Sequence, residues 1–440
     1  MKASEIANEI EYLQPLKWFG KVTRVVGLTI EARGPQAAVG DICLIYPTNE
    51  RDPLQAEVVG FKESLLLLMP FSPTAHIQPG SLVKSTGKPL TIGVGTGLIG
   101  KVIDGLGHPL DGGERPKGLY KTSVERSPPN PLTRPRITRP LSLGVRAVDG
   151  LLTVGEGQRV GIFAGSGVGK STLMAMFTKY SEADINVIAL IGERGREVKD
   201  FIDKDLGDEG RKNTIVVVAT SDQPALVRIK GAMAATAIAE YFRDQGKRVN
   251  LMMDSITRFA MAQREIGLAI GEPPTTKGYT PSVFALLPRL LERSGTSEYG
   301  SITAFYTVLV DGDDLDEPIA DAVRGILDGH FILDRKLANK GHYPALNILK
   351  SVSRLLPDIV SEEHGAAASV LRQHLATYEE NEDLIQVGAY KRGTSKDIDL
   401  ALDLQPDIQA FLQQGTDKPL NFTKTTEQLQ ILAGKGNDGR

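Results

Sequence analysis

The sequence has few of the residues that define several common protein classes. Its 440 residues include one cysteine and one tryptophan, and aromatic residues make up 6% of the chain. A single cysteine, Cys43, excludes an internal disulfide framework and is typical of a protein from a reducing compartment. Because Cys43 lies in the apolar run 42–45, we expect a small buried side chain rather than a reactive thiol.

The chain also lacks a strong net charge and a long hydrophobic run. Lysine and arginine total 51 and aspartate and glutamate total 54, a net charge of −3 that gives no global basic field for nucleic acid. No apolar run approaches the roughly 20 residues of a membrane-spanning helix, and the first residues lack a signal-peptide pattern. We therefore expect a soluble cytoplasmic protein, with peripheral membrane association left open.

What the chain does have is a glycine-rich loop at residues 164–171 of the kind that binds phosphate, called a P-loop below. Residues 164–171 read Ala-Gly-Ser-Gly-Val-Gly-Lys-Ser, between an apolar strand predicted at 159–163 and a helix predicted from Thr172. Glycines let such a loop curl so that backbone N–H groups converge on phosphate oxygens, and the helix N-terminus adds a favourable dipole. In this pattern Lys170 reaches the β- and γ-phosphates and the Ser171 hydroxyl ligates Mg²⁺. The residues predicted to bind the nucleotide are Gly165, Ser166, Gly167, Val168, Gly169, Lys170, Ser171 and Thr172.

Composition divides the chain into five segments. Residues 1–19 carry apolar residues at helical spacing, which predicts a helix that either caps the next domain or docks a partner. Short β-like runs in 20–94 predict a small β-barrel, and 95–144 form a Gly- and Pro-rich connector. Strands alternate with helices in 145–356, which predicts a mostly parallel sheet. Helical patterns fill 357–440 and end in a polar tail from Gly434 that we expect to be disordered.

The predicted fold is therefore an α/β P-loop NTPase core, preceded by a small β-barrel and followed by a helical domain. A barrel of this kind can bind single-stranded RNA. This one shows no cluster of basic residues with interleaved aromatics, so we favour a structural or assembly role for it.

Two acidic residues follow apolar strands downstream of the P-loop. Asp254 ends the run 249–254, where it would hold Mg²⁺ through water, although apolar strands ending in aspartate are common. Glu193 follows the run 186–191, where its carboxylate would orient and polarise water in line with the γ-phosphate. A solvated turn is the alternative for Glu193, but ligands gather at strand ends in open α/β sheets.

Two further residues can be interpreted either as functional residues or as ordinary surface and packing residues. Arg354 would be a surface charge in an isolated domain, but in a ring of P-loop domains it can reach the neighbouring site. Tyr343 either stacks on adenine or simply packs before Pro344. The guanine-reading motif Asn-Lys-x-Asp is absent, since 339–342 reads Asn-Lys-Gly-His, and the histidines show no metal-ligand spacing.

Taken together, these segments resemble the rotary and secretion ATPases related to the catalytic subunit of the F-type ATP synthase. Three motifs occur in the family's order, namely the P-loop, Gly-Glu-Arg-Gly-Arg-Glu at 192–197 and Pro-Ala-Leu-Asn-Ile-Leu-Lys-Ser-Val-Ser-Arg at 344–354. Within this family the chain is similar to the flagellum-specific ATPases of the bacterial type III export apparatus. The segments that carry this closer similarity are 277–293, 313–330 and 388–394.

The resemblance implies a RecA-like core in a homohexamer, with ATP and Mg²⁺ at each subunit interface. It places Arg194 close to the phosphates, Arg354 on the neighbour's ATP and Tyr343 on adenine, with Tyr390 on the other face of the base. Non-catalytic subunits of rotary ATPases lack the glutamate that Glu193 supplies. Both Glu193 and Arg354 in one chain therefore favour a self-sufficient ring.

The resemblance also implies a function and partners. The function is ATP hydrolysis that energises export of flagellar proteins, without nucleic acid, at the inner face of the cytoplasmic membrane. The partners are a stator-like regulator at the N-terminal helix, a central stalk protein, chaperone–substrate complexes at the C-terminal helices and the membrane export gate. The alternatives are a virulence injectisome ATPase, an RNA-translocating hexameric helicase and a non-enzymatic subunit of a rotary complex.

Overall fold

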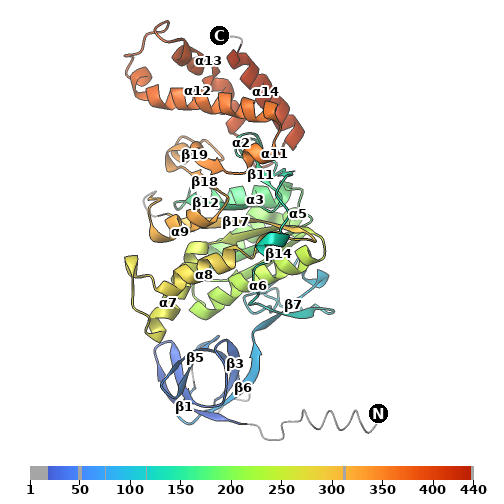
Figure 1. Cartoon of the computed structure of the whole chain (residues 1–440), viewed down its shortest axis with the longest axis vertical. Coiled ribbons are helices and arrows are strands. Elements are labelled where there is room, and N and C mark those ends of the chain that lie inside the picture. The colour runs from blue at the N-terminus through green and yellow to red at the C-terminus, as the bar shows by residue number, and fades with distance from the viewer. Residues whose placement is uncertain (1–17, 48–51, 75, 115, 311–313, 438–440) are drawn as a thin grey trace.

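The computed structural model describes residues 18–47, 52–74, 76–114, 116–310 and 314–437. Three parts follow one another along the long axis of the molecule, with a β-barrel at one end, an α/β core in the middle and a helical domain at the other end (Figure 1). The helix predicted for residues 1–19 lies outside the described residues except for Trp18 and Phe19, which are not helical. No helix of the described part has the length and apolarity needed to cross a membrane.

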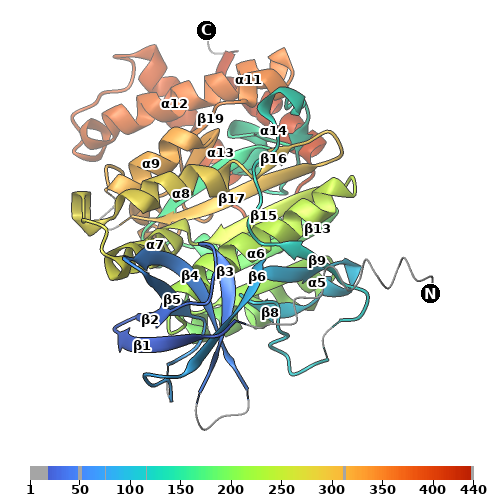
Figure 2. The same ribbon diagram turned by 60° about the horizontal axis from the view of Figure 1, so that its bottom comes forward.

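Six antiparallel strands form the closed barrel, in the order β1-β2-β5-β4-β3-β6, and β6 pairs with β1 to close it (Figure 2). Alternate residues of each strand point into the barrel. In β3, for example, Cys43 and Ile45 are fully buried, and burial raises the pKa of the Cys43 thiol to about 11. The predicted role of Cys43 as a buried apolar residue is confirmed. The strands are β1 (Gly20–Val26), β2 (Thr29–Arg33), β3 (Asp41–Tyr46), β4 (Leu54–Lys62), β5 (Leu65–Pro70) and β6 (Leu82–Pro89).

The core is one sheet with the strand order β19-β18-β12-β17-β15-β13-β14-β8. Its pairings are parallel, except that the edge strand β19 runs antiparallel to β18 and the short β16 runs antiparallel to β17. The predicted, mostly parallel sheet is confirmed. Its strands are β8 (Val102–Asp104), β12 (Arg159–Ala164), β13 (Ile185–Ile191), β14 (Thr214–Ala219), β15 (Arg248–Asp254), β16 (Gly295–Thr296), β17 (Ser301–Leu309), β18 (Gly329–Leu333) and β19 (Leu346–Ser353).

Helices cover both faces of this sheet, so its central strands are buried throughout. In β13, Val187 and Ala189 face a core formed with α6, α7 and α8, whereas Ile188 and Leu190 face a second core formed with α3. This two-sided burial accounts for the continuous apolar runs of the sequence. The core helices are α2 (Arg146–Leu151), α3 (Lys170–Tyr180), α4 (Gly195–Asp200), α5 (Gly207–Arg211), α6 (Ala225–Asp244), α7 (Ile256–Ile270), α8 (Pro281–Leu291), α9 (Pro318–Ile326) and α10 (Arg335–Asn339), with a π-helical turn at Phe201–Leu206 between α4 and α5.

The segment 95–144 is more than a connector. Its strand β8 pairs in parallel with β14 and forms an edge of the core sheet. Strand β9 (Tyr120–Ser123) pairs with β7 (Thr91–Val94), and β10 (Pro140–Leu141) pairs with β11 (Val154–Gly155). Sequence reasoning missed β8 because its three residues are surrounded by glycines, and a strand that short has no readable period.

In the part of the C-terminal domain that the structure describes there are four helices. Helix α12 packs against α13 and α14, and α14 also packs against α2 of the core. The expected disordered tail is wrong in part, because residues 434–437 continue α14, whereas 438–440 lie outside the described residues. The helices are α11 (Leu356–Ile359), α12 (Glu362–Gln386), α13 (Lys396–Leu412) and α14 (Phe422–Asn437).

Buried charges join the parts of the chain. Lys230 of α6 is 3% exposed, and its Nζ lies 2.7 Å from Glu57 of the barrel and 2.6 Å from Glu125 of the connector. Further along α6, both carboxylate oxygens of Glu240 accept hydrogen bonds from Arg293, at 2.9 and 2.8 Å. Arg293 also donates to the Val124 carbonyl, so this one pair ties the connector to the core.

We predict that Glu240→Ala strongly destabilises the fold. Glu240 is 1% exposed and Arg293 is 3% exposed, so the substitution leaves an unpaired guanidinium in the core. Removing one partner of a buried ion pair costs about 3–5 kcal/mol of unfolding free energy. Urea denaturation measures this loss, with the exposed Glu298→Ala as control, for which we expect a change within about 0.5 kcal/mol. A loss for Glu240→Ala no larger than that of the control would contradict the prediction.

Candidate active site

The P-loop joins the end of β12 to the start of α3. Gly167 and Gly169 adopt left-handed φ values of 78° and 93°, a conformation that glycine reaches without strain. Gly169 is the residue before α3, and its carbonyl accepts the Leu173 N–H at 3.1 Å. The backbone of the loop therefore curls directly into the helix N-terminus, as a phosphate cradle requires.

A cavity of about 520 Å³ lies over this loop at the carboxyl ends of the core strands. It brings together the predicted P-loop residues and three of the predicted catalytic side chains. Val168 is the exception, because it is 1% exposed and packs in the hydrophobic core. The cavity is lined by Ala164, Gly165, Ser166, Gly167, Gly169, Lys170, Ser171, Thr172, Leu190, Glu193, Arg194, Glu197, Val198, Phe201, Asp254, Arg258, Leu309 and Val310.

Lys170 and Asp254 meet at the floor of the cavity. The Lys170 Nζ lies 2.5 Å from Asp254 Oδ1, and the same oxygen accepts a 2.7 Å hydrogen bond from Thr307 of β17. Burial disfavours the charged amine, but the carboxylates of Asp254 and Glu193 outweigh it, so the pKa of Lys170 is raised. The carboxylates thus favour the charged form of Lys170 in the cavity. Sequence reasoning missed Thr307, which lies in an apolar strand with no motif around it.

Glu193 lies at the end of β13 with its side chain 14% exposed. Burial, together with the charge of Asp254, raises the pKa of Glu193 to about 7, although Lys170 opposes the shift. Its Oε1 lies 3.7 Å from the Lys170 Nζ and is buried without a hydrogen-bond partner among the described residues. A buried acceptor of this kind is suited to binding a water molecule inside the cavity.

Two arginines line the same cavity. Arg194 is 75% exposed, and its Nη1 donates a 2.7 Å hydrogen bond to Glu197, so it lies at the rim rather than over the P-loop. Arg258 of α7, which sequence reasoning missed, has a buried Nε without a partner in the described part of the chain. Its side chain passes over Gly192, where an added Cβ would lie 2.7 Å from the Arg258 Cβ. Its place four residues after Asp254, in the first turns of α7, is the sequence signal that could have identified it.

These side chains fit a nucleoside triphosphate with Mg²⁺. The curled backbone of the P-loop and the Lys170 ammonium offer donors for phosphate oxygens. The unpartnered Arg258 Nε is a further donor, and the unpartnered Glu193 Oε1 is an acceptor for water. Hydroxyl and carboxylate oxygens, as in Ser171 and Asp254, are the ligands that Mg²⁺ prefers.

A second cavity of about 420 Å³ adjoins the first and shares Gly167, Gly169 and Thr172 with it. The Tyr343 ring lies against the P-loop, 3.4 Å from the position of a Cβ on Gly169. The other wall comes from the loop after α13, which is the Gln414–Thr416 segment that sequence reasoning missed. The backbone N–H of Gln414 donates to the Tyr343 carbonyl at 2.9 Å, so the C-terminal domain forms one wall of this pocket.

Tyr390 is not brought to either cavity. It lies between α12 and α13, where its hydroxyl hydrogen-bonds to the Ser395 carbonyl and to Asp399. In this structure the loop containing Gln414 lies beside Tyr343, and the position of Tyr390 on the base stays a prediction.

Arg354 is also remote from the P-loop of its own chain. It follows β19, whose Ser353 pairs with Gly329 at the start of β18, and Gly329 in turn pairs with Val160 at the start of β12. The P-loop begins after Ala164 at the opposite end of β12, which is about 13 Å away at 3.3 Å per residue. Arg354 is exposed, so it is available to another molecule rather than to its own site.

Three family models match the chain. The nucleotide-binding domain of the ATP synthase alpha/beta family matches residues 144–353, and the beta-barrel domain of that family matches 22–87. The T3SS EscN ATPase C-terminal domain matches 360–431. Fold and site thus define a P-loop ATPase, and the chain belongs to the ATP synthase alpha/beta family.

Within that family, the chain is similar to ATPases of flagella and of type III secretion. It is 61% identical over 435 residues to the flagellum-specific ATP synthase of Bacillus subtilis (strain 168), with 99% of both chains covered. It is 50% identical over 424 residues to the type 3 secretion system ATPase of Xanthomonas euvesicatoria, with 96% of both covered.

Two solved structures of a type III secretion ATPase also match the chain. The assembled ATPase EscN from the enteropathogenic E. coli type III secretion system matches with a TM-score of 0.88 at 45% identity, over 94% of this chain and 100% of that one. EscN in complex with its central stalk EscO matches with a TM-score of 0.87 at 46% identity over the same shares. The predicted barrel, α/β core and helical C-terminal domain are confirmed.

We predict that Tyr343→Ala raises the KM for ATP about 10-fold, because stacking of a base on an aromatic ring contributes about 1–3 kcal/mol. The expected change in kcat is small, since Tyr343 lies beside the P-loop and away from Glu193. Steady-state hydrolysis as a function of ATP concentration measures both constants. Tyr343→Phe is the matched control and should keep the KM. An unchanged KM in Tyr343→Ala would leave Tyr343 with a packing role only.

Proposed function

We propose that this chain is a Mg²⁺-dependent ATPase that forms a homohexameric ring and energises export of flagellar proteins. The observation that carries the proposal is the single cavity in which the P-loop, Lys170, Glu193 and Asp254 come together in one chain. The 61% identity to a flagellum-specific ATP synthase over the full chain supports the flagellar role.

In this proposal each side chain has a defined task. The P-loop N–H groups and Lys170 bind the β- and γ-phosphates, while Ser171 and Asp254 hold Mg²⁺, Asp254 through water. Bound Mg²⁺ neutralises charge on the phosphate oxygens. Glu193 accepts a hydrogen bond from water and orients it for in-line attack on the γ-phosphorus, so that the bond to the β-phosphate bridging oxygen breaks and ADP leaves. Tyr343 and the loop containing Gln414 enclose the adenine.

The position of Arg354 supports the proposed ring. Because Arg354 lies at the opposite end of β12 from its own P-loop and is exposed, it is available to a neighbouring subunit. A closed ring lets each subunit offer one face as the nucleotide site and the other face as the source of Arg354. The assembled state of EscN supports this arrangement.

The partners proposed for this chain follow from its relatives. EscN was solved with its central stalk EscO, so we propose that a central stalk protein passes through the ring of this chain as well. A stator-like regulator at the N-terminal segment, chaperone–substrate complexes at the C-terminal helices and an export gate at the inner membrane face complete the proposal. With these partners, the proposed location of the chain is the cytoplasm, peripheral to the membrane.

The second candidate is the ATPase of a virulence injectisome. The match of residues 360–431 to the EscN C-terminal domain favours it, whereas the higher identity to the flagellum-specific relative, 61% against 50%, favours the flagellar role. Affinity purification of the tagged protein from its own cells, followed by mass spectrometry, separates the two. Flagellar export components in the eluate support the proposal, and injectisome components or RNA would overturn the biological role while leaving the catalytic assignments in place.

A further inference from the structure

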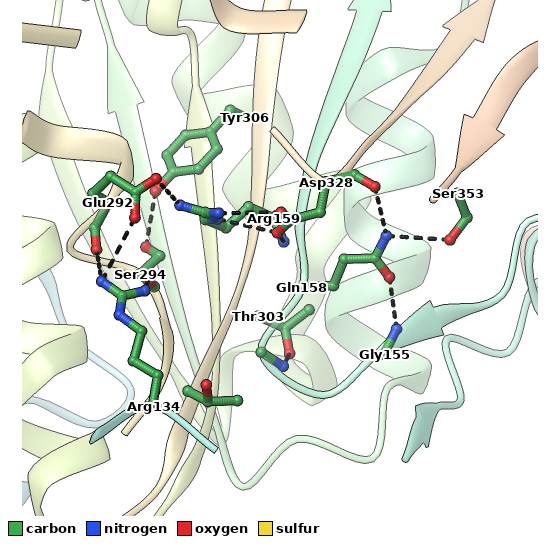
Figure 3. A network of polar contacts seen from close by, with 12 residues as sticks. Arg134, Gly155, Gln158, Arg159, Glu292, Ser294, Thr303, Tyr306, Asp328 and Ser353 are labelled. Carbon is green, nitrogen blue, oxygen red and sulfur yellow. Dashed lines mark hydrogen bonds and ion pairs between the residues drawn. The ribbon is translucent and has the colours of Figure 1, made fainter. Parts of the chain in front are cut away.

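A network of polar contacts lies at the start of β12 and reaches Ser353, the residue before Arg354 (Figure 3). Its centre is the side chain of Gln158, which is fully buried. The Gln158 Nε2 donates to the Ser353 hydroxyl at 3.1 Å and to the Asp328 carbonyl at 3.3 Å, while its Oε1 accepts the Gly155 N–H at 2.8 Å. One amide group thus joins three separate segments of the chain.

The network holds the backbone at Ser353 and Arg354. The Arg354 N–H donates at 3.0 Å to the same Asp328 carbonyl that accepts from Gln158. The Ser353 hydroxyl, which accepts from Gln158, donates in turn to the Thr153 carbonyl at 2.7 Å. Asp328 itself is held by Arg159, whose Nε and Nη2 each lie 3.1 Å from its carboxylate oxygens. The backbone of Arg354 is therefore held, although its side chain is exposed.

The guanidinium of Arg354 has little to hold it in place within its own chain. Its one contact among the described residues is a 3.4 Å hydrogen bond to the Arg324 carbonyl. A long, exposed side chain adopts many rotamers. The position of its backbone therefore decides how often the guanidinium reaches the neighbouring site. A positional error of about 1 Å at a reacting centre can cost 10²-fold in rate.

We infer that Gln158 is a positioning residue for catalysis, which fixes Arg354 for the neighbouring subunit's ATP through Ser353 and Asp328. The inference rests on the proposed function, since it needs Arg354 at the neighbour's site. The two ends of β12 then have different tasks. The start of the strand, beside Gln158, positions Arg354 for the neighbouring subunit, and its end leads into the P-loop of its own chain.

The test is Gln158→Met in the assembled protein, which keeps the side-chain volume but removes the amide. We expect kcat to fall about 10-fold while the KM for ATP stays within 2-fold, because the P-loop of the same chain is unaffected. In an Arg354→Ala background the same substitution should lower kcat no further, since groups that act as one unit are non-additive. A merely structural role for Gln158 would lower kcat in both backgrounds alike.

The matched control is Thr303→Val. The Thr303 hydroxyl accepts a 2.8 Å hydrogen bond from the Gly157 N–H in the same turn and is also buried. Among the described residues it makes no hydrogen bond to Ser353 or Asp328 (Figure 3). It should leave kcat unchanged. Should Gln158→Met fail to fold, Ser353→Ala probes the same contact from β19, and we expect a several-fold loss of kcat that again disappears in the Arg354→Ala background.

The outcomes separate the inference from the proposed function. A normal rate in assembled Arg354→Ala would overturn the proposed role of Arg354, and the inference with it. A slow Arg354→Ala beside a normal Gln158→Met, or additive losses in the double variant, would overturn the inference alone. A loss in Thr303→Val as large as in Gln158→Met would also overturn it, because it would show damage to the turn rather than to the position of Arg354.

Discussion

Replacing Glu193 with glutamine is expected to slow ATP turnover by orders of magnitude while ATP binding persists. The Glu193 Oε1 is buried without a hydrogen-bond partner in the described part of the chain and lies 3.7 Å from the Lys170 Nζ, inside the cavity over the P-loop. Glutamine keeps the shape of the side chain but carries no charge to polarise water. Because a positioned acid or base contributes roughly 10²–10⁴ in rate, we expect a loss of that order.

Two measurements on the assembled protein check this expectation. Phosphate release gives the turnover, and titration with a fluorescent ATP analogue gives the affinity, which should change by less than about 3-fold because Lys170 and the P-loop remain. Glu197→Gln is the matched control, since Glu197 lines the same cavity but is 40% exposed and pairs with Arg194, and we expect it to lose less than about 10-fold. Undiminished hydrolysis in Glu193→Gln would remove Glu193 from the mechanism.

Replacing Arg354 with alanine should cost on the order of 10³ or more in rate, and only in the assembled protein. A trans-acting arginine neutralises charge on the transferring phosphoryl group, and its removal has an effect of that size. Arg354 lies at the opposite end of β12 from its own P-loop, so the substitution should not change the hydrolysis rate of a dilute, unassembled chain. Hydrolysis rates per chain over a range of protein concentrations measure the difference.

Mixing two inactive variants makes the same prediction sharper. Arg354→Ala chains keep an intact Glu193 site, and Glu193→Gln chains keep an intact Arg354. In a mixed ring some interfaces combine the two intact halves, so the mixture should hydrolyse ATP faster than either variant alone. Lys350→Ala is the control on the same edge strand, because Lys350 is an exposed cation that pairs with Asp334, and it should keep the normal rate. Equal rates for Arg354→Ala and the unmodified chain at high concentration would argue against a trans role.

The catalytic set could be predicted from sequence because each member stands in a local pattern. Glycine at 167 and 169 is required by the backbone of the loop, and Glu193 and Asp254 each follow an apolar strand. The carboxyl ends of neighbouring parallel strands lie at one edge of a sheet, so these residues had to come together once the sheet formed. The spacing of residues within a few turns or strands was sufficient for that conclusion.

Other features of the site could not be predicted in this way. Thr307 reaches Asp254 from 53 residues away, and Gln158 reaches Ser353 from 195 residues away. Tyr390 and Gln414 both belong to the helical domain, but only Gln414 lies beside Tyr343. The packing of α12 against α13 decides which of the two loops lies beside Tyr343, and no local sequence pattern predicts this packing.

The sequence by itself determined the P-loop, the acidic residues at the strand ends and the division into barrel, core and helices, because these depend on residue type and short-range spacing. Only the tertiary structure decided that β8 joins the core sheet, that the loop containing Gln414 lies beside Tyr343, and that Arg354 lies far from its own P-loop. Those outcomes depend on the order and direction of the strands and on which distant segments pack together, and both arise from burying apolar surface over the whole chain.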